Sequence, residues 1–154
     1  MKSIILTYAP VTETERRILT DTNIFKLAVN QHAEDLKPDA RIITDYILKI
    51  ICEHFPQKII SVRDKFRYES PRVEYFKTEF KGATIVAALE YLIFKNYNEI
   101  LILGDNSVNT DEFQNLVKYE IDKIKEKAKV YQYKNGNFNL PVMSVNEFCK
   151  DSCV

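Results

Sequence analysis

Hydrophobic positions along the chain follow two alternating patterns, which predict strands and helices in turn. Short unbroken apolar runs recur, and between them apolar residues return at every third or fourth position. Unbroken runs are typical of strands buried on both faces of a parallel sheet, and the wider spacing is typical of amphipathic helices. The alternation therefore predicts an α/β fold with a mainly parallel sheet and helices on both of its faces.

The clearest unit spans residues 80–109. Apolar residues within 85–93 form one broad helical face, and the run over 100–103 predicts a central strand buried on both faces. Gly82 would open the helix, and Thr84 lies early enough to help cap it. A helix followed by a buried strand is the repeating unit of a parallel α/β sheet.

The remaining elements complete one Rossmann-like, three-layer domain over 1–154. Thr12 and Glu15 have capping-box spacing at the start of the first helix. Residues 63–79 show no regular pattern, and we expect a loop with a short helix there. Further strands are predicted over 2–6, 24–29, 40–44, 58–62 and, as an edge strand, 129–133, and helical segments over 13–19, 31–36, 46–55, 110–127 and 146–149.

Composition limits the functions that this domain can have. The 154 residues include 22 basic and 22 acidic side chains, so the chain lacks the basic footprint of a nucleic-acid-binding protein. No apolar run approaches the roughly 20 residues of a membrane span. The first residues lack the pattern of a secretory signal, so we expect a cytoplasmic protein.

The standard chemical motifs are absent from the sequence. Neither a glycine-rich dinucleotide fingerprint, nor a Walker loop, nor a nucleophile elbow occurs. Cys52 is expected in the core and Cys149 and Cys153 in the tail, and their spacing predicts no metal site. His54, at a helix end, is expected to be structural, whereas His32 follows a strand and is a candidate ligand or base.

Polar residues follow successive predicted strands. The carboxyl ends of parallel strands share one edge of a sheet, where ligands bind in open α/β folds. Loops are polar in any case, and Gly-Asp is ordinary turn chemistry, so the pattern predicts a pocket but no particular ligand. These residues are Thr7 and Tyr8, Asn30 and His32, Asp45 and Tyr46, Arg63 and Asp64, and Gly104, Asp105 and Asn106.

Several of these segments, in this order, resemble the nucleotide-sugar half of the bacterial family 42 sialyltransferases. They are also similar to the related domain of motility accessory factors and archaeal pterin pyrophosphokinases. The similar segments are 4–12, 24–30, 40–46 and, above all, 82–105, with Pro10, Asn30, Asp45, Gly82, Gly104 and Asp105 at the family's motif positions.

The resemblance implies a nucleotide or nucleotide sugar as ligand, while the cofactor stays unknown. Asn30 and Asp45 would bind the base or ribose, and Gly82 would let a helix N-terminus approach a phosphate. Asp105 would bind a metal or a hydroxyl. The implied binding residues are Thr7, Asn30, Asp45, Gly82, Thr84, Gly104, Asp105 and Asn106, and the candidate catalytic residues are His32 and Asp105.

Departures from the family pattern argue against sialyl transfer. The first loop lacks the family's Gly and Asn, and Lys81 stands where a Ser is expected. No His occurs near Asn106, and the lid insertion after Asp105 is missing, so the usual base and water-excluding element are absent. The chain would be glycosyltransferase-like if active. The alternative is a non-enzymatic interaction domain of the same fold, including one that forms a homo-oligomer.

Overall fold

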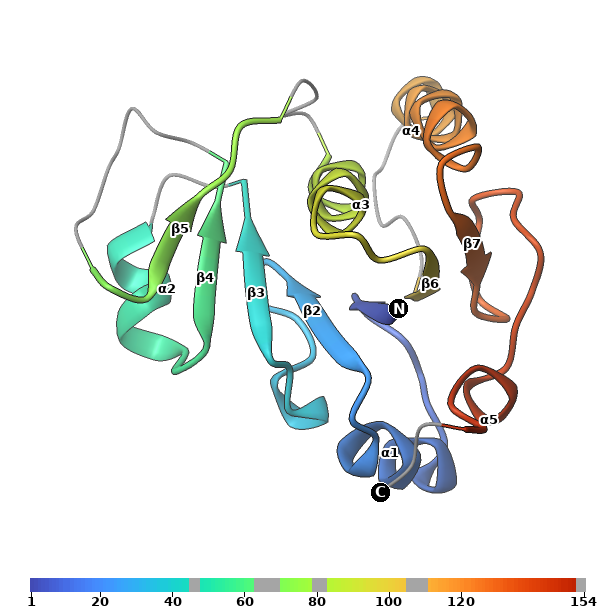
Figure 1. Cartoon of the computed structure of the whole chain (residues 1–154), viewed down its shortest axis with the longest axis horizontal. Helices are drawn as coiled ribbons and strands as arrows, with labels where there is room; N and C mark the ends of the chain where they lie inside the picture. The colour runs from blue at the N-terminus through green and yellow to red at the C-terminus, as the bar shows by residue number, and fades with distance from the viewer. Residues whose placement is uncertain (45–47, 63–69, 79–82, 105–110, 152–154) are drawn as a thin grey trace.

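The computed structural model describes residues 1–44, 48–62, 70–78, 83–104 and 111–151. Within them, seven parallel strands form one sheet in the order β5-β4-β3-β2-β1-β6-β7 (Figure 1). The strands are β1 (Lys2–Leu6), β2 (Phe25–Val29), β3 (Ala40–Ile43), β4 (Lys58–Ser61), β5 (Val73–Tyr75), β6 (Glu99–Leu103) and β7 (Lys129–Gln132). The predicted parallel α/β sheet is confirmed.

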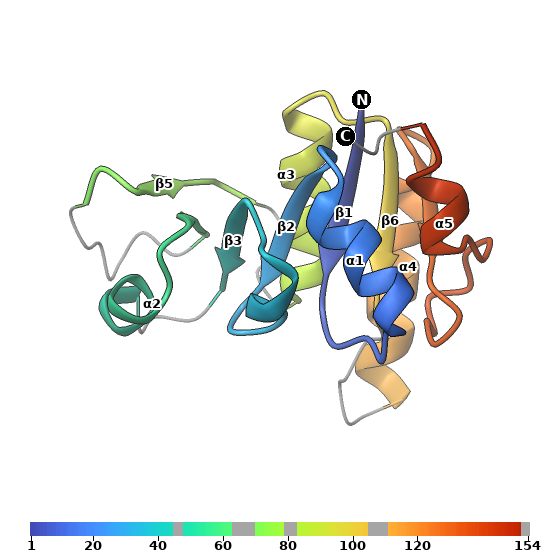
Figure 2. The ribbon, with the colours of Figure 1, turned by 90° about the horizontal axis from the view of Figure 1, so that it is seen from below.

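Helices cover both faces of this sheet, which gives three layers (Figures 1 and 2). On one face, α3 and α4 bury one set of alternating strand residues, among them Ile5, Leu27 and Ile102. On the other face, α1, α2 and α5 cover the opposite set, including Ile4 and Leu101. The helical elements are α1 (Glu13–Asp21), the 3-10 turn η1 (Glu34–Leu36), α2 (Leu48–His54), α3 (Thr84–Phe94), α4 (Asp111–Ile124) and α5 (Val145–Phe148).

The strand order reverses beside β1, and this reversal fixes where a ligand crevice can form. From β1 the chain builds β2 to β5 on one side, and α3 then returns it to β6 on the other side of β1. At the carboxyl end of this pair the Thr7 amide donates to the Leu103 carbonyl at 3.0 Å. In open α/β sheets ligands bind at such a point, outside the carboxyl ends of the strands.

Three expectations differ from the structure in detail. Strand β5 lies within 63–79, where no strand was predicted, because its three half-buried residues have no apolar run. Residues Ile100–Leu103 are fully buried as predicted, but β6 lies next to the edge strand β7, and the middle strand is β2. Cys149 is completely buried beside α5 and belongs to the core rather than to an exposed tail.

Two smaller expectations, the capping box of α1 and the burial of Cys52, are confirmed. Thr12 and Glu15 form a complete capping box at the start of α1. Cys52 is buried in the cluster beneath α2. In the described part of the chain, no helix has the length and apolar character that a membrane span needs. No group of three or more metal-binding side chains gathers among those same residues.

Candidate functional site

Four of the predicted site residues lie at the carboxyl edge of the sheet. Thr7 follows β1, Asn30 follows β2, Gly104 follows β6, and Thr84 begins α3. The remaining predicted binding residues, Asp45, Gly82, Asp105 and Asn106, lie outside the described residues, so their roles stay predictions.

Asn30, Thr44 and Thr84 form a hydrogen-bonded cluster, here called the Asn30 junction. The Asn30 Nδ2 donates to Thr84 Oγ1 at 3.2 Å, and that hydroxyl lies 2.8 Å from the Thr44 Oγ1. The junction thus ties the ends of β2 and β3 to the start of α3. Asn30 has a left-handed backbone (φ 52°), which asparagine adopts more readily than most residues.

One polar atom of the Asn30 junction has no partner. The Asn30 Oδ1 is buried and makes no hydrogen bond within the described part of the chain. If the side-chain oxygen and nitrogen were assigned the other way round, the nitrogen would be the atom without a hydrogen bond, because Thr84 contacts only one of the two. A buried carbonyl oxygen without a donor costs about 1–3 kcal/mol, so this position favours a ligand that donates a hydrogen bond.

The start of α3 lacks a side-chain cap. Its N-cap is Ala83, whereas Thr12 and Ser144 accept hydrogen bonds from the first turns of α1 and α5. Thr84 was expected to help cap the helix, but its hydroxyl instead joins the Asn30 junction. Free amide groups and the helix dipole make an uncapped N-terminus favourable for an anion.

At the strand-order reversal, Gly104 and Thr7 are in close contact. A Cβ on Gly104 would lie 2.0 Å from Thr7 Oγ1 and 2.5 Å from the Tyr8 carbonyl oxygen. Gly104 also has φ +130°, a conformation that L-residues rarely adopt. Glycine is therefore required here by backbone geometry, and its presence does not by itself indicate a ligand.

A polar pocket of about 280 Å³ opens on the α1 side of the same edge. It lies between residues 7–11, which follow β1, and residues 32–36, which follow β2, and Arg16 of α1 reaches it. His32 and Thr7 both line it, so the structure brings these two predicted residues to one pocket. The Arg16 guanidinium is ion-paired with Asp35, which neutralises much of its charge.

Arg41 holds the segment after β2 in place, and sequence reasoning missed it. Its fully buried guanidinium donates from Nη1 to the carbonyls of Asn30 (2.7 Å) and His32 (2.6 Å), and from Nη2 to Glu34. The Phe55 ring stacks on it at 4.1 Å. Burial lowers the pKa of Arg41, and the Glu34 carboxylate opposes that shift. In the sequence, the only indication of this role was that Arg41 is the single charged residue in the otherwise apolar run 40–43.

A second hydrogen-bonded pair, also missed, joins Tyr133 to Glu15. The Tyr133 hydroxyl donates to the Glu15 carboxylate at 2.7 Å, which joins the end of β7 to α1. Burial, together with the hydrogen bond to Glu15 and its charge, raises the Tyr133 pKa to about 12. Burial raises the pKa of Glu15, but hydrogen bonds from Thr12 and Tyr133 outweigh it and leave a net lowering. Both groups are thus held in their ordinary neutral-pH forms, which suits a structural contact.

Comparison with family models, with curated proteins and with solved structures gives no match for this chain. The function of the site is therefore inferred from its own residues and geometry.

Proposed function

We propose that the domain binds a nucleotide or nucleotide sugar along the carboxyl edge of its sheet. The observation that carries the proposal is the buried, unpartnered Asn30 Oδ1. A ribose hydroxyl or a base amino group would supply the missing donor and remove the cost of leaving this oxygen unpaired. The Thr84 hydroxyl accepts from the Asn30 amide, and the Thr44 hydroxyl contacts Thr84; both would offer further hydrogen bonds to the same ligand.

The phosphate groups would lie at the start of α3. That N-terminus has no side-chain cap, and it adjoins the Asn30 junction through Thr84. Backbone amides and the helix dipole would then stabilise the phosphate charge. In the sequence, Gly82 comes just before this turn, and its lack of a side chain would allow a phosphate to approach the backbone closely. The base-contacting and phosphate-contacting groups would thus come from adjoining elements.

The biological setting that we propose follows from the resemblance, which is to enzymes that use nucleotide sugars in surface or flagellar glycan metabolism. We expect no sialyl transfer by the chain alone, because the sequence has no His near Asn106 and no lid segment. The assay is release of cytidine monophosphate from a cytidine-linked sialic acid. Turnover would contradict this expectation, and His32→Ala would then test His32 as a substitute base.

Nucleotide binding is tested by calorimetric titration with CMP, UMP, AMP and GMP. Asn30→Gly removes the amide but keeps the left-handed backbone accessible. We expect the affinity for the bound nucleotide to fall roughly tenfold or more. Asn139→Gly is the matched control, since Asn139 is an exposed, left-handed asparagine (φ 60°) far along the chain. The nucleotide affinity of this variant should equal that of the wild-type protein.

Two results would overturn the proposal. One is the absence of binding by all four nucleotides at millimolar concentration. The other is an Asn30→Gly variant that binds as tightly as the wild-type protein.

The alternative function is that of an accessory domain that binds other proteins and no nucleotide. The observation in its favour is Phe94, whose side chain is 67% exposed at the end of α3. Large exposed aromatic side chains are enriched in protein interfaces.

A further inference from the structure

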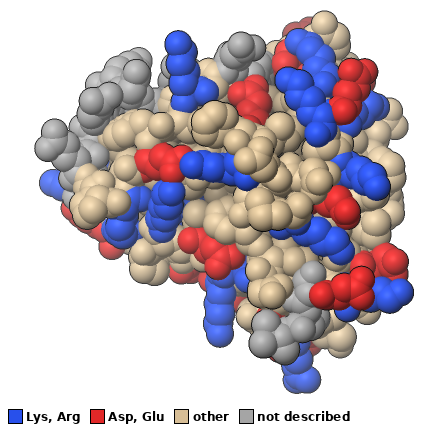
Figure 3. All heavy atoms as spheres, in the orientation of Figure 1, with Lys and Arg blue, Asp and Glu red and all other residues tan. Residues whose placement is uncertain are grey.

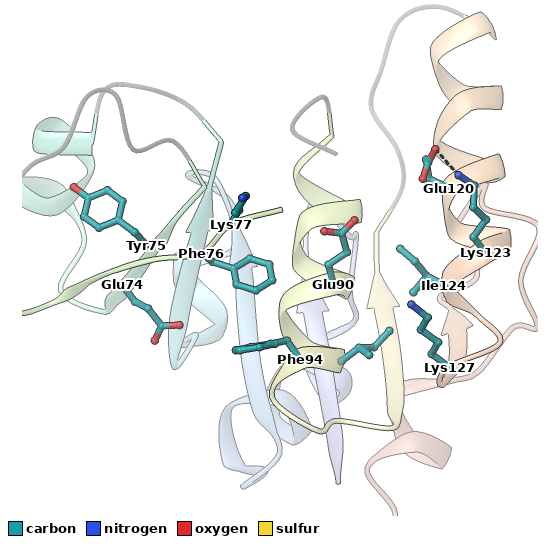
Figure 4. A pocket seen from close by; sticks show the side chains of 11 residues that line it. Glu74, Tyr75, Phe76, Lys77, Glu90, Phe94, Glu120, Lys123, Ile124 and Lys127 are labelled. Carbon is teal, nitrogen blue, oxygen red and sulfur yellow. Dashed lines mark hydrogen bonds and ion pairs between the residues drawn. The ribbon is translucent and has the colours of Figure 1, made fainter. Parts of the chain in front are cut away.

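A groove of about 620 Å³ lies on the outer surface of α3 (Figure 4). We call it the α3 groove. One wall is residues 74–77, and the other is formed by α4 and Lys127, which follows it. Phe94 and Ile93 lie at the end of α3, whereas the Asn30 junction is at its start, roughly 15 Å away along an 11-residue helix. The groove is therefore a separate surface from the proposed nucleotide site.

The floor of the α3 groove is apolar and aromatic. Phe76, Ile93, Phe94 and Ile124 line it, and the rings of Phe76 and Phe94 lie 5.6 Å apart. Phe94 keeps two thirds of its surface exposed. An apolar patch with a polar rim is typical of a surface that binds another protein.

The apolar surface continues along α4. Leu116 and Tyr119 are 41% and 60% exposed. Each lies one helical turn before a residue of the groove wall, Leu116 before Glu120 and Tyr119 before Lys123, so they share the same helix face. The exposed face is thus longer than the groove itself, which suits a protein partner better than a small molecule.

Charges on the rim of the groove are balanced. Its lining includes three glutamates and three lysines, and on the face shown in Figure 3 the two signs are interleaved without a continuous patch of either. A nucleic acid or another partner of a single sign gains little from such a surface. A partner whose positive and negative groups lie opposite groups of the other sign in the groove gains more electrostatic attraction.

Two of the groove's lysines have no carboxylate partner in the part of the chain that the structure describes. Glu74 pairs with Lys58 at 2.6 Å and Lys95 at 3.6 Å, and Lys123 pairs with Glu120 at 3.2 Å. Within the described residues, Lys77 and Lys127 make no ion pair, and they lie on opposite walls of the groove (Figure 4).

The order of charges on one wall is the reverse of the order on the other. Toward the start of α3, Figure 4 shows Lys77 on one wall and the ion pair of Glu120 and Lys123 on the other, with Glu90 of α3 between the two walls. Toward the end of α3 it shows Glu74 facing Lys127. A rotation of 180° about an axis parallel to α3 exchanges the two walls. A second copy placed by this rotation would bring its Glu120 to Lys77 and its Glu74 to Lys127.

We propose that the α3 groove is the interface of a symmetric dimer whose two-fold axis runs along α3. Each unpaired lysine then meets a carboxylate of the partner, and every such contact occurs twice, as in all isologous interfaces. Phe94 lies near the axis and packs against the aromatic floor of the partner's groove. The second copy thereby covers the exposed ring and both lysines at once.

Sedimentation velocity over a range of protein concentrations tests this dimer. We expect concentration-dependent dimers for the wild-type chain. Phe94→Glu should weaken self-association roughly thirtyfold or more, since a charge at the centre of an interface removes a principal apolar contact. Ile50→Glu is the matched control, because Ile50 is 50% exposed on α2 in the opposite helical layer, and its dimerisation should be unchanged.

A charge exchange tests the two-fold arrangement itself. Lys77→Glu and Glu120→Lys should each weaken the dimer, and the double variant should restore it, because the exchanged charges meet across the axis. The proposal is overturned by a wild-type chain that stays monomeric at high concentration, which would leave the groove to a different partner. It is equally overturned by a Phe94→Glu variant that dimerises like the wild type, or by a double variant with no recovery.

Discussion

Substituting Gly104 by alanine should destabilise the fold more than any other single-methyl addition in the described chain. The new Cβ would lie 2.0 Å from Thr7 Oγ1 and 2.5 Å from the Tyr8 carbonyl oxygen. The Thr7 hydroxyl can rotate away, but the Tyr8 oxygen belongs to the backbone. The β1–α1 connection would therefore have to move, and it lines the polar pocket.

The magnitude follows from two separate costs. A residue other than glycine at φ +130° stores about 1–3 kcal/mol of backbone strain. Forcing a methyl group into a filled site costs a further 1–3 kcal/mol or so. The sum centres on about 4 kcal/mol, a large part of the roughly 5–15 kcal/mol that stabilises a typical domain. For a domain of this size it corresponds to a fall in Tm of roughly 10 °C.

Urea denaturation of Gly104→Ala and of the wild type measures this difference. Gly136→Ala is the comparison, because its φ is not left-handed and the substitution therefore has only a steric cost. Its new Cβ would lie 2.8 Å from the Gln132 Cβ and 3.0 Å from the Tyr133 carbonyl oxygen. We expect Gly136→Ala to cost about 1–3 kcal/mol, less than Gly104→Ala, which also has the backbone strain. Adding Thr7→Ala to Gly104→Ala should recover only part of the loss, since the strain and the Tyr8 contact remain. A Gly104→Ala protein within about 1 kcal/mol of the wild type would refute the reasoning.

Two further predictions concern buried polar groups. By ultraviolet absorbance, Tyr133 should titrate near pH 12 rather than 10. Between these two pH values the folded chain keeps a proton that the unfolded chain loses, so the free energy of unfolding should fall as the pH rises. Tyr133→Phe should remove the share of that pH dependence that comes from Tyr133, while Tyr91 and Tyr97, whose pKa values burial also raises, keep theirs. The variant should cost about 1.5 kcal/mol for the lost bond to the Glu15 carboxylate, and an unchanged alkaline profile would contradict the prediction. Arg41→Met should cost about 3 kcal/mol or more in urea, because two carbonyls lose their buried donor. Arg17→Met, on an exposed arginine, should be neutral, and equal stabilities of the two variants would contradict the role of Arg41.

The architecture could be inferred from local pattern because burial selects residue type along each strand. Unbroken apolar runs such as 100–103 mark strands covered on both faces, and the capping box of Thr12 and Glu15 marks a helix start. Strand β5 has no such run, since an edge strand with half-buried residues needs none. Its place in the sheet depends on pairing with β4, which is a tertiary contact.

The site was predictable only in its position. Parallel strands put their carboxyl ends at one edge, so the sequence by itself indicated that Thr7 and Asn30 lie there. Which side chains touch was decided by the tertiary structure. The bond from Asn30 to Thr84 joins residues 54 positions apart, and Tyr133 and Glu15 are separated by 118. No local pattern encodes such distances, because they depend on how the helices pack on the sheet.

What the sequence determined is therefore the set of elements, their parallel arrangement and the edge at which polar residues gather, since all three follow from local periodicity and chain connectivity. Only the folded chain decided that Arg41 is buried against two carbonyls, that Gly104 has no room for a side chain, and that the α3 groove has charges in reversed order on its two walls. These features arise where segments distant in sequence meet, and the free energy of such contacts is set by three-dimensional packing rather than by neighbours along the chain.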